Sequence, residues 1–162
     1  MNIVLSRIDD RFIHGQVLTK WIKVQPIERI IIVSDEVASD AMRKTLILSV
    51  APANVKASAV SVTKMAAAYK STRYENTNVM LLFEGPSDVE RLIEAGVPIK
   101  EVNVGGMRFE IGRKQITKAV SITEEDYVSF QNLDKKNVKL ELRQLPGDES
   151  KDFIKIVEKE MK

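Results

Sequence analysis

The sequence contains no cysteine and only one histidine, His14, among its 162 residues. Without cysteine there is no disulfide framework, no thiolate nucleophile and no cysteine-based metal site. A single histidine also excludes the paired-histidine zinc motifs. We therefore expect a protein that uses neither a metal ion nor another cofactor.

Long hydrophobic runs are also missing. Apolar stretches extend for only about five or six residues, whereas a membrane-spanning helix needs roughly 20. The first residues lack the basic, apolar and small-residue layout of a signal peptide. These two absences predict a soluble, cytoplasmic protein.

The chain carries little excess charge and few aromatic residues. The formal net charge is +2 and aromatic residues make up 6% of the sequence, so no segment resembles a basic, base-stacking surface. We expect no nucleic-acid partner. Hydrophobic residues make up 44%, which is enough for a sizeable core, and residues 1–162 are predicted to form a single domain.

Short apolar runs alternate with segments whose apolar residues recur at helical spacing. Strands are predicted at residues 3–8, 30–33, 55–60, 78–84, 101–104 and 138–142. Helices are predicted between residues 15 and 26, 34 and 51, 61 and 70, 87 and 96, 123 and 136, and after 147. Between residues 107 and 122 the alternation stops, and we expect a loop and a short edge strand over 115–120. The pattern predicts an α/β fold with an open, mostly parallel β-sheet and helices on both faces.

Residues 7–17 follow the first predicted strand and concentrate the chemistry of the chain. They contain Arg7, Arg11, Asp9, Asp10 and His14. A nucleophilic imidazole, fixed positive charge and the N–H groups of a following helix suit a phosphoryl group at neutral pH. We expect both guanidinium groups to reach that group, and one carboxylate to orient the imidazole.

Each of these residues also has an ordinary structural interpretation. A lone histidine often serves as a hydrogen-bonded or helix-capping residue, and aspartates are favoured in turns and caps. Gly15 is predicted to let the backbone turn tightly before the helix. Ligands of open parallel sheets bind beyond the carboxyl ends of the strands. The candidate rim of a phosphate or partner site at that edge comprises Gly15, Gln16, Ser34, Asp35, Gly105 and Gly106, although the last two glycines are equally expected to serve only as a turn.

The whole of residues 7–17 resembles the phosphorylation-site motif of the enzyme IIB component of the mannose/fructose/sorbose family of the bacterial sugar phosphotransferase system. Residues 32–38, 91–97 and 102–107 resemble further segments of that family in the same order. The resemblance therefore covers essentially the whole chain, and it implies the same open, mainly parallel sheet.

The resemblance also implies a function, that of a protein-N(pi)-phosphohistidine–sugar phosphotransferase. In this interpretation His14 accepts a phosphoryl group from enzyme IIA and passes it to a hexose-type sugar held by the membrane components IIC and IID. Arg11 stabilises the moving group, Asp9 orients the imidazole and Arg7 lends charge. Peripheral association with the membrane transporter is implied, and a homodimer remains open.

Three alternatives remain beside this interpretation. A phosphate- or nucleotide-binding regulatory module is one, although the sequence has neither a Gly-x-Gly-x-x-Gly turn nor a Gly-Lys-Ser/Thr loop. A receiver-like module phosphorylated on Asp9 or Asp10 is the second. A homologue that acts only as a regulator is the third.

Overall fold

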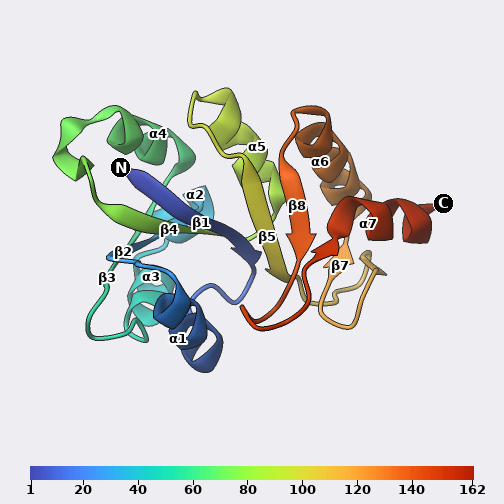
Figure 1. The fold of residues 1–162 in the computed structure, drawn as a ribbon, viewed down its shortest axis with the longest axis horizontal. Coiled ribbons are helices and arrows are strands. Elements are labelled where there is room, and N and C mark those ends of the chain that lie inside the picture. Colours follow the sequence, from blue (N-terminus) through green and yellow to red (C-terminus); the bar gives the residue numbers. More distant parts are fainter.

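The computed structural model describes the backbone of residues 1–162 and the side chains of all of them except Gln16. Strands and helices alternate along most of the chain (Figure 1). The strands are β1 Asn2–Asp9, β2 Arg29–Val33, β3 Lys56–Val60, β4 Asn78–Phe83, β5 Glu101–Gly106, β6 Lys114–Gln115, β7 Ser121–Ile122, β8 Lys139–Leu142 and β9 Lys151–Asp152. The helices are α1 Gly15–Val24, α2 Asp35–Ser39, α3 Ala41–Leu48, α4 Val62–Lys70, α5 Pro86–Glu94, α6 Glu124–Lys135 and α7 Phe153–Met161, with a 3₁₀ turn, η1, at Thr72–Tyr74.

The main sheet has seven strands in the order β3-β2-β4-β1-β5-β8-β9. Neighbouring strands are parallel except for β8 and the short β9, which are antiparallel. The first strand, β1, therefore lies inside the sheet between β4 and β5. This order could not be derived from the sequence, and it determines which loops surround the end of β1.

Alternating side chains of the buried strands enter two separate cores. In β2, Ile30 and Ile32 pack in one core, whereas Ile31 and Val33 pack in the other. A parallel strand that is covered on both faces needs such a continuous apolar run. Helices α1 to α3 cover one face and α4 to α7 the other (Figure 1). The predicted open, mostly parallel sheet with helices on both faces is confirmed.

The helices that follow β1 and its two neighbours leave toward opposite faces of the sheet. Leu18 of α1 belongs to one core, while Val89 of α5 and Phe130 of α6 belong to the other. Such a change of direction leaves a crevice beyond the carboxyl ends of the strands, where ligands of this fold class bind. The turn after β1 lies at this point.

Two predictions about the elements were wrong. The helix expected between residues 34 and 51 is divided into α2 and α3 by Asp40, which has an extended backbone. The glycine pair Gly105 and Gly106, expected in a turn, belongs to β5. Gly106 pairs with Asp9 of β1, so the strand continues through both glycines, which are buried.

The C-terminal third also differs in detail from the prediction. The expected edge strand over 115–120 is replaced by β6 and β7, which form a separate two-stranded antiparallel sheet. The short β9 at the edge of the main sheet was not predicted, because two residues are too few to produce a recognisable pattern. Helix α6 begins at the expected place, where Thr123 and Asp126 cap it reciprocally.

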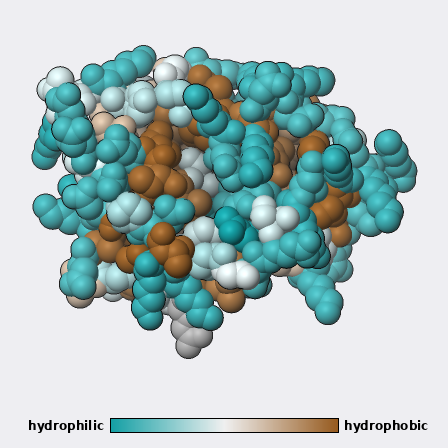
Figure 2. All heavy atoms as spheres, in the orientation of Figure 1, coloured by the Kyte–Doolittle hydropathy of each residue, from teal (hydrophilic) through white to brown (hydrophobic). Residues whose placement is uncertain are grey.

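Hydrophilic residues cover most of the face seen in Figure 2, with hydrophobic residues at the surface only between them. Within the described part of the chain, the helices are too short and too polar for any of them to cross a bilayer.

Asp40 offers a test of the division between α2 and α3. Its Oδ1 accepts a hydrogen bond of 3.0 Å from the backbone N–H of Arg43, which caps α3. We expect Asp40→Ala to lower the free energy of unfolding by about 1 kcal/mol, the usual cost of losing such a cap, and Asp40→Asn to retain most of it. Urea denaturation measures both. Equal stability of the alanine variant and the wild type would show that the cap contributes nothing.

Candidate functional site

A strand, a tight turn and a helix hold the candidate site at the end of β1. The carbonyl of Asp9 accepts a hydrogen bond of 2.9 Å from the N–H of Phe12, which closes the turn. Phe12 is buried and has a φ of 55°, the left-handed conformation that non-glycine residues rarely adopt. The tight bend expected at Gly15 is therefore at Phe12, and Gly15 is the first residue of α1.

His14 lies at the junction between this turn and α1. It is the N-cap residue of the helix, but its side chain makes no capping hydrogen bond. The side chain is 24% exposed, and its Nε2 lies 2.8 Å from Oδ2 of Asp9. An ionised carboxylate can only accept, so Nε2 carries the proton and Nδ1 of the neutral ring keeps its lone pair. Within the described residues the ring makes no other hydrogen bond.

Asp9 is the centre of the site. Its carboxylate is fully buried and accepts hydrogen bonds at both oxygens. Oδ2 accepts from Arg7 Nη2 at 3.0 Å and from His14 Nε2, and Oδ1 accepts from the backbone N–H and the Nε of Arg11, at 3.2 and 3.3 Å. Burial alone would raise the pKa of Asp9, but the hydrogen bond from His14 and the charge of Arg7 outweigh it and hold that pKa below its usual value. Asp9 therefore stays ionised and fixed in one orientation.

The two arginines of the motif occupy different environments. The guanidinium group of Arg11 is 46% exposed, beside the buried carboxylate of Asp9. Arg7 is only 2% exposed, and its Nη1 donates to the side chain of Asn103 and, at 3.2 Å, to the carbonyl of Arg143. The expectation that both guanidinium groups reach a phosphoryl group does not fit this geometry. The exposed guanidinium of Arg11 is accessible to a phosphoryl group, whereas the buried guanidinium of Arg7 contacts Asp9 from the protein interior.

The two glycines at the end of β5 make room for these side chains. An added Cβ at Gly105 would lie 2.1 Å from the guanidinium of Arg7, and one at Gly106 would lie 3.3 Å from Nη2 of Arg11 and 3.5 Å from Oδ1 of Asp9. The backbone of β5 therefore passes close to the side chains of both arginines. Gly105 and Gly106 flank the buried side of the site.

Of the remaining rim candidates, some lie beside His14 and others follow a different strand. Gly15 adjoins His14 directly, and the side chain of Gln16 lies outside the described residues. Ser34 and Asp35 follow β2, which β4 separates from β1, and each has a structural partner: Ser34 caps α2, and Asp35 accepts from the backbone N–H of Val62. Both belong to a depression of about 310 Å³. Its charged lining consists of five carboxylates and two guanidinium groups, those of Asp35, Glu36, Glu84, Asp88, Asp126, Arg91 and Arg113. The excess of carboxylates disfavours a phosphate group at Ser34 and Asp35.

Asp10, the second acid of the motif, has a different role from Asp9. It is buried, and its Oδ2 accepts a hydrogen bond of 2.8 Å from the backbone N–H of Arg108. The same oxygen lies 3.8 Å from Nε of Arg108 and from Nη1 of Arg113. Asp10 therefore ties the loop after β5 to the turn that carries His14.

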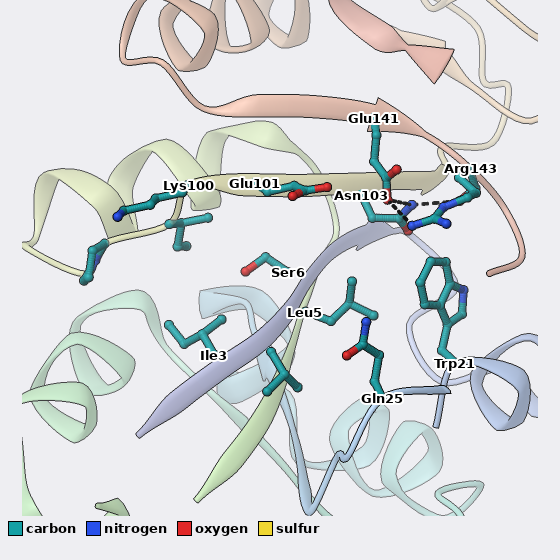
Figure 3. Close-up of a pocket in the computed structure, with 13 residues that line it drawn as sticks. Ile3, Leu5, Ser6, Trp21, Gln25, Lys100, Glu101, Asn103, Glu141 and Arg143 are labelled. Carbon is teal, nitrogen blue, oxygen red and sulfur yellow. Dashed lines mark hydrogen bonds and ion pairs between the residues drawn. The ribbon is translucent and has the colours of Figure 1, made fainter. Parts of the chain in front are cut away.

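Sequence reasoning missed Asn103 and Glu141, which lie behind the site. Both are buried, and Figure 3 shows them pointing toward one another from β5 and β8. They form the inner wall of a cleft of about 380 Å³ that opens where β1 and β5 diverge. A signal was present, because each is a polar residue between two apolar ones in a strand. In the described part of the chain, no three His, Asp or Glu side chains converge as metal ligands would.

A family model described as the PTS system sorbose subfamily IIB component matches residues 3–162. The chain belongs to this family of IIB components. The resemblance predicted from the sequence is thereby confirmed, and as a IIB component the protein takes part in phosphotransfer during sugar uptake.

Related IIB proteins match along the whole chain. The fructose-specific EIIB component of Bacillus subtilis is 70% identical over 157 residues, which cover 97% of this chain and 96% of that protein. The mannose-specific EIIAB component of Escherichia coli K12 is 48% identical over 159 residues, and this chain spans 49% of its length.

Solved structures agree with this assignment. A structure described as phosphoenolpyruvate-dependent phosphotransferase system is 69% identical, with a TM-score of 0.97 over 98% of this chain and 99% of that one. The IIBSor domain of the sorbose permease from Klebsiella pneumoniae is 43% identical, with a TM-score of 0.94 over 98% of each chain.

The close approach at Gly105 predicts a measurable cost. We expect Gly105→Ala to lower the free energy of unfolding of this IIB component by about 1–3 kcal/mol, because the new methyl group must displace the buried guanidinium of Arg7. Gly147→Ala is the matched control, since nothing lies within 4 Å of its added Cβ. Denaturant unfolding measures both variants. Equal stabilities for the two would contradict the packing described here.

The lowered pKa of Asp9 predicts a dependence of stability on pH. Its contribution is present above the pKa of an unfolded aspartate, about 3.9, and is lost as pH falls through the lower pKa of the folded protein. Asp9→Asn lacks this titration. The difference in unfolding free energy between wild type and Asp9→Asn should therefore shrink from about pH 5 to about pH 2. Urea denaturation across this range tests it, and a difference that does not change with pH would contradict it.

Proposed function

We propose that Nδ1 of His14 accepts a phosphoryl group from a phosphohistidine on an enzyme IIA and passes it to a hexose-type sugar. The observation that carries this proposal is the hydrogen bond of 2.8 Å between Nε2 of His14 and the buried carboxylate of Asp9. That bond fixes the proton on Nε2, so the lone pair of the neutral ring is on Nδ1.

The chemistry requires little beyond alignment and positive charge. The lone pair of Nδ1 forms the new N–P bond while the N–P bond of the donor breaks and its electron pair returns to the donor imidazole. Positive charge that develops on the ring of His14 is balanced by Asp9 through the Nε2–H hydrogen bond. In the second step the sugar oxygen forms an O–P bond while the N–P bond to His14 breaks. The electron pair of the broken bond returns to Nδ1, and the proton of the sugar hydroxyl passes to solvent.

The charges around Asp9 favour an incoming phosphate. One carboxylate lies between the guanidinium groups of Arg7 and Arg11, so the cluster keeps a net positive charge. Arg11 is exposed enough to contact the equatorial oxygens, and the N–H groups of the first turn of α1 lack a side-chain cap from His14. These donors need no metal to neutralise a phosphoryl group.

The proposed partners follow from the family. One relative is named a mannose-specific EIIAB component, and this name combines IIA and IIB. The combination supports an enzyme IIA as the donor. We propose that the acceptor sugar is presented by the membrane components IIC and IID, with the protein bound peripherally on their cytoplasmic side. The partial exposure of His14 at the edge of the sheet is compatible with access for both partners in turn.

Phosphorylation by a reconstituted donor relay tests the proposal. We expect one label per wild-type chain, stable in alkali and lost in acid, and none on His14→Ala. Arg11→Ala should slow transfer by about a hundredfold, the usual effect of removing one donor to a transition-state oxygen. Lys23→Ala, which alters an exposed residue of α1, should keep the wild-type rate.

The lability of the label separates the alternatives. A label on His14→Ala, or one that is lost in alkali, would indicate an acyl phosphate on Asp9 or Asp10 and would refute the proposal. Rapid transfer by Arg11→Ala would refute the role given to that guanidinium group.

A further inference from the structure

Three buried polar residues stand side by side across the centre of the sheet. In the strand register Arg7 of β1 pairs with Asn103 of β5, and Asn103 pairs with Glu141 of β8. Arg7 is 2%, Asn103 1% and Glu141 3% exposed. We refer to these three residues as the polar rung. Asn103 and Glu141 are visible together in Figure 3.

Hydrogen bonds connect the rung, and each one runs from donor to acceptor in the order Arg7, Asn103, Glu141. Asn103 accepts from Nη1 of Arg7, and its own amide donates to Oε1 of Glu141 at 3.2 Å and to the carbonyl of Arg143 at 2.9 Å. Glu141 also accepts from the guanidinium of Arg143 at 2.9 Å and from the hydroxyl of Ser150. The amide of Asn103 is thereby oriented with its oxygen toward Arg7.

This arrangement fixes the orientation of the Arg7 guanidinium group, with only Nη2 donating to a residue of the site. Nη1 is held by Asn103 and by the carbonyl of Arg143, while Nη2 donates to Oδ2 of Asp9, the same oxygen that accepts from His14. The ring of Trp21 lies 5.6 Å from the guanidinium carbon and covers it. Burial lowers the pKa of Arg7, and the carboxylates of Asp9 and Glu141 oppose that shift.

A polar rung is expensive in a sheet core, because each buried polar group must be hydrogen-bonded to offset its loss of water. Apolar residues in these three strands would pack without that cost. The rung does provide a rigid support behind Asp9. A carboxylate supported in this way keeps the imidazole in one tautomer and orientation.

We propose that Asn103 is a positioning residue for the phosphorylation site. It fixes Arg7 against Asp9, and through them it keeps the proton of the neutral imidazole on Nε2 and the lone pair on Nδ1 of His14. Asn103 touches neither the imidazole nor the phosphoryl group. The consequence for phosphoryl transfer rests on the proposed function, whereas the consequence for the imidazole does not.

Two variants of Asn103 test this inference. Asn103→Leu and Asn103→Ala both remove the hydrogen bonds to Arg7 and Glu141, and the alanine variant does so without added bulk. Val102→Ala is the matched control, because Val102 is a fully buried neighbour on the same strand that packs in the core on the opposite face. This variant is expected to destabilise the sheet without removing a side chain that takes part in the hydrogen bonds of the rung.

The first measurement is ¹⁵N NMR of the His14 ring at alkaline pH, where the ring is neutral. In wild type and in Val102→Ala we expect the proton on Nε2, and in both Asn103 variants a mixture of the two tautomers. The second is the rate of phosphorylation by the reconstituted relay. We expect a tenfold to about a hundredfold loss in kcat for the Asn103 variants with little change in the KM for the donor, because the nucleophile is misaligned and the docking surface is intact.

The outcomes separate this inference from the proposed function. A wild-type tautomer and rate in either folded Asn103 variant would overturn the role of Asn103. An equal loss in Val102→Ala would also overturn it, since the effect would then be one of general stability. A wild-type chain that takes no label on His14 would refute the proposed function, while the tautomer measurement would still decide whether Asn103 positions the ring.

Discussion

The site depends on a single buried carboxylate. Asp9 accepts hydrogen bonds from Arg7, Arg11 and His14, and these side chains come from the end of one strand and the turn that follows it. Because four N–H groups of these three residues converge on two oxygens, a change in any of them alters the hydrogen bonds of the others. The rest of the architecture gives this carboxylate its surroundings. The central position of β1 buries it, the glycines of β5 make room for its partners, and α1 begins where the imidazole leaves the protein interior.

The layers of the fold were readable from the sequence, because each apolar run has the length and periodicity of the element it forms. The cluster from Arg7 to His14 was readable for a different reason, since its residue types are unusual together. Strand order was not readable, because it depends on which apolar faces meet in three dimensions. The burial of Arg7 was not readable either. Arginine is mostly found at surfaces, and its position here depends on Gly105, which is distant in the sequence.

Local propensity was overridden by tertiary packing at one mispredicted position and prevailed at another. Gly15 was expected to provide the tight turn, but the left-handed residue is Phe12, whose ring is held in the core beside Ile13 and Leu18. Tertiary packing thus stabilises a backbone conformation that the residue alone disfavours. At Asp40 the opposite holds, since a capping residue in the middle of an apolar pattern ended one helix and began another.

The contact between Arg7 and Gly105 has a consequence for the history of this family. The guanidinium occupies the space in which any other residue at position 105 would place its first carbon. A chain that acquires a larger residue there must shorten or lose the side chain at position 7, and Asp9 would then need another cation. The residues at positions 7 and 105 are therefore expected to covary among homologues, so that a change at one position is accompanied by a change at the other.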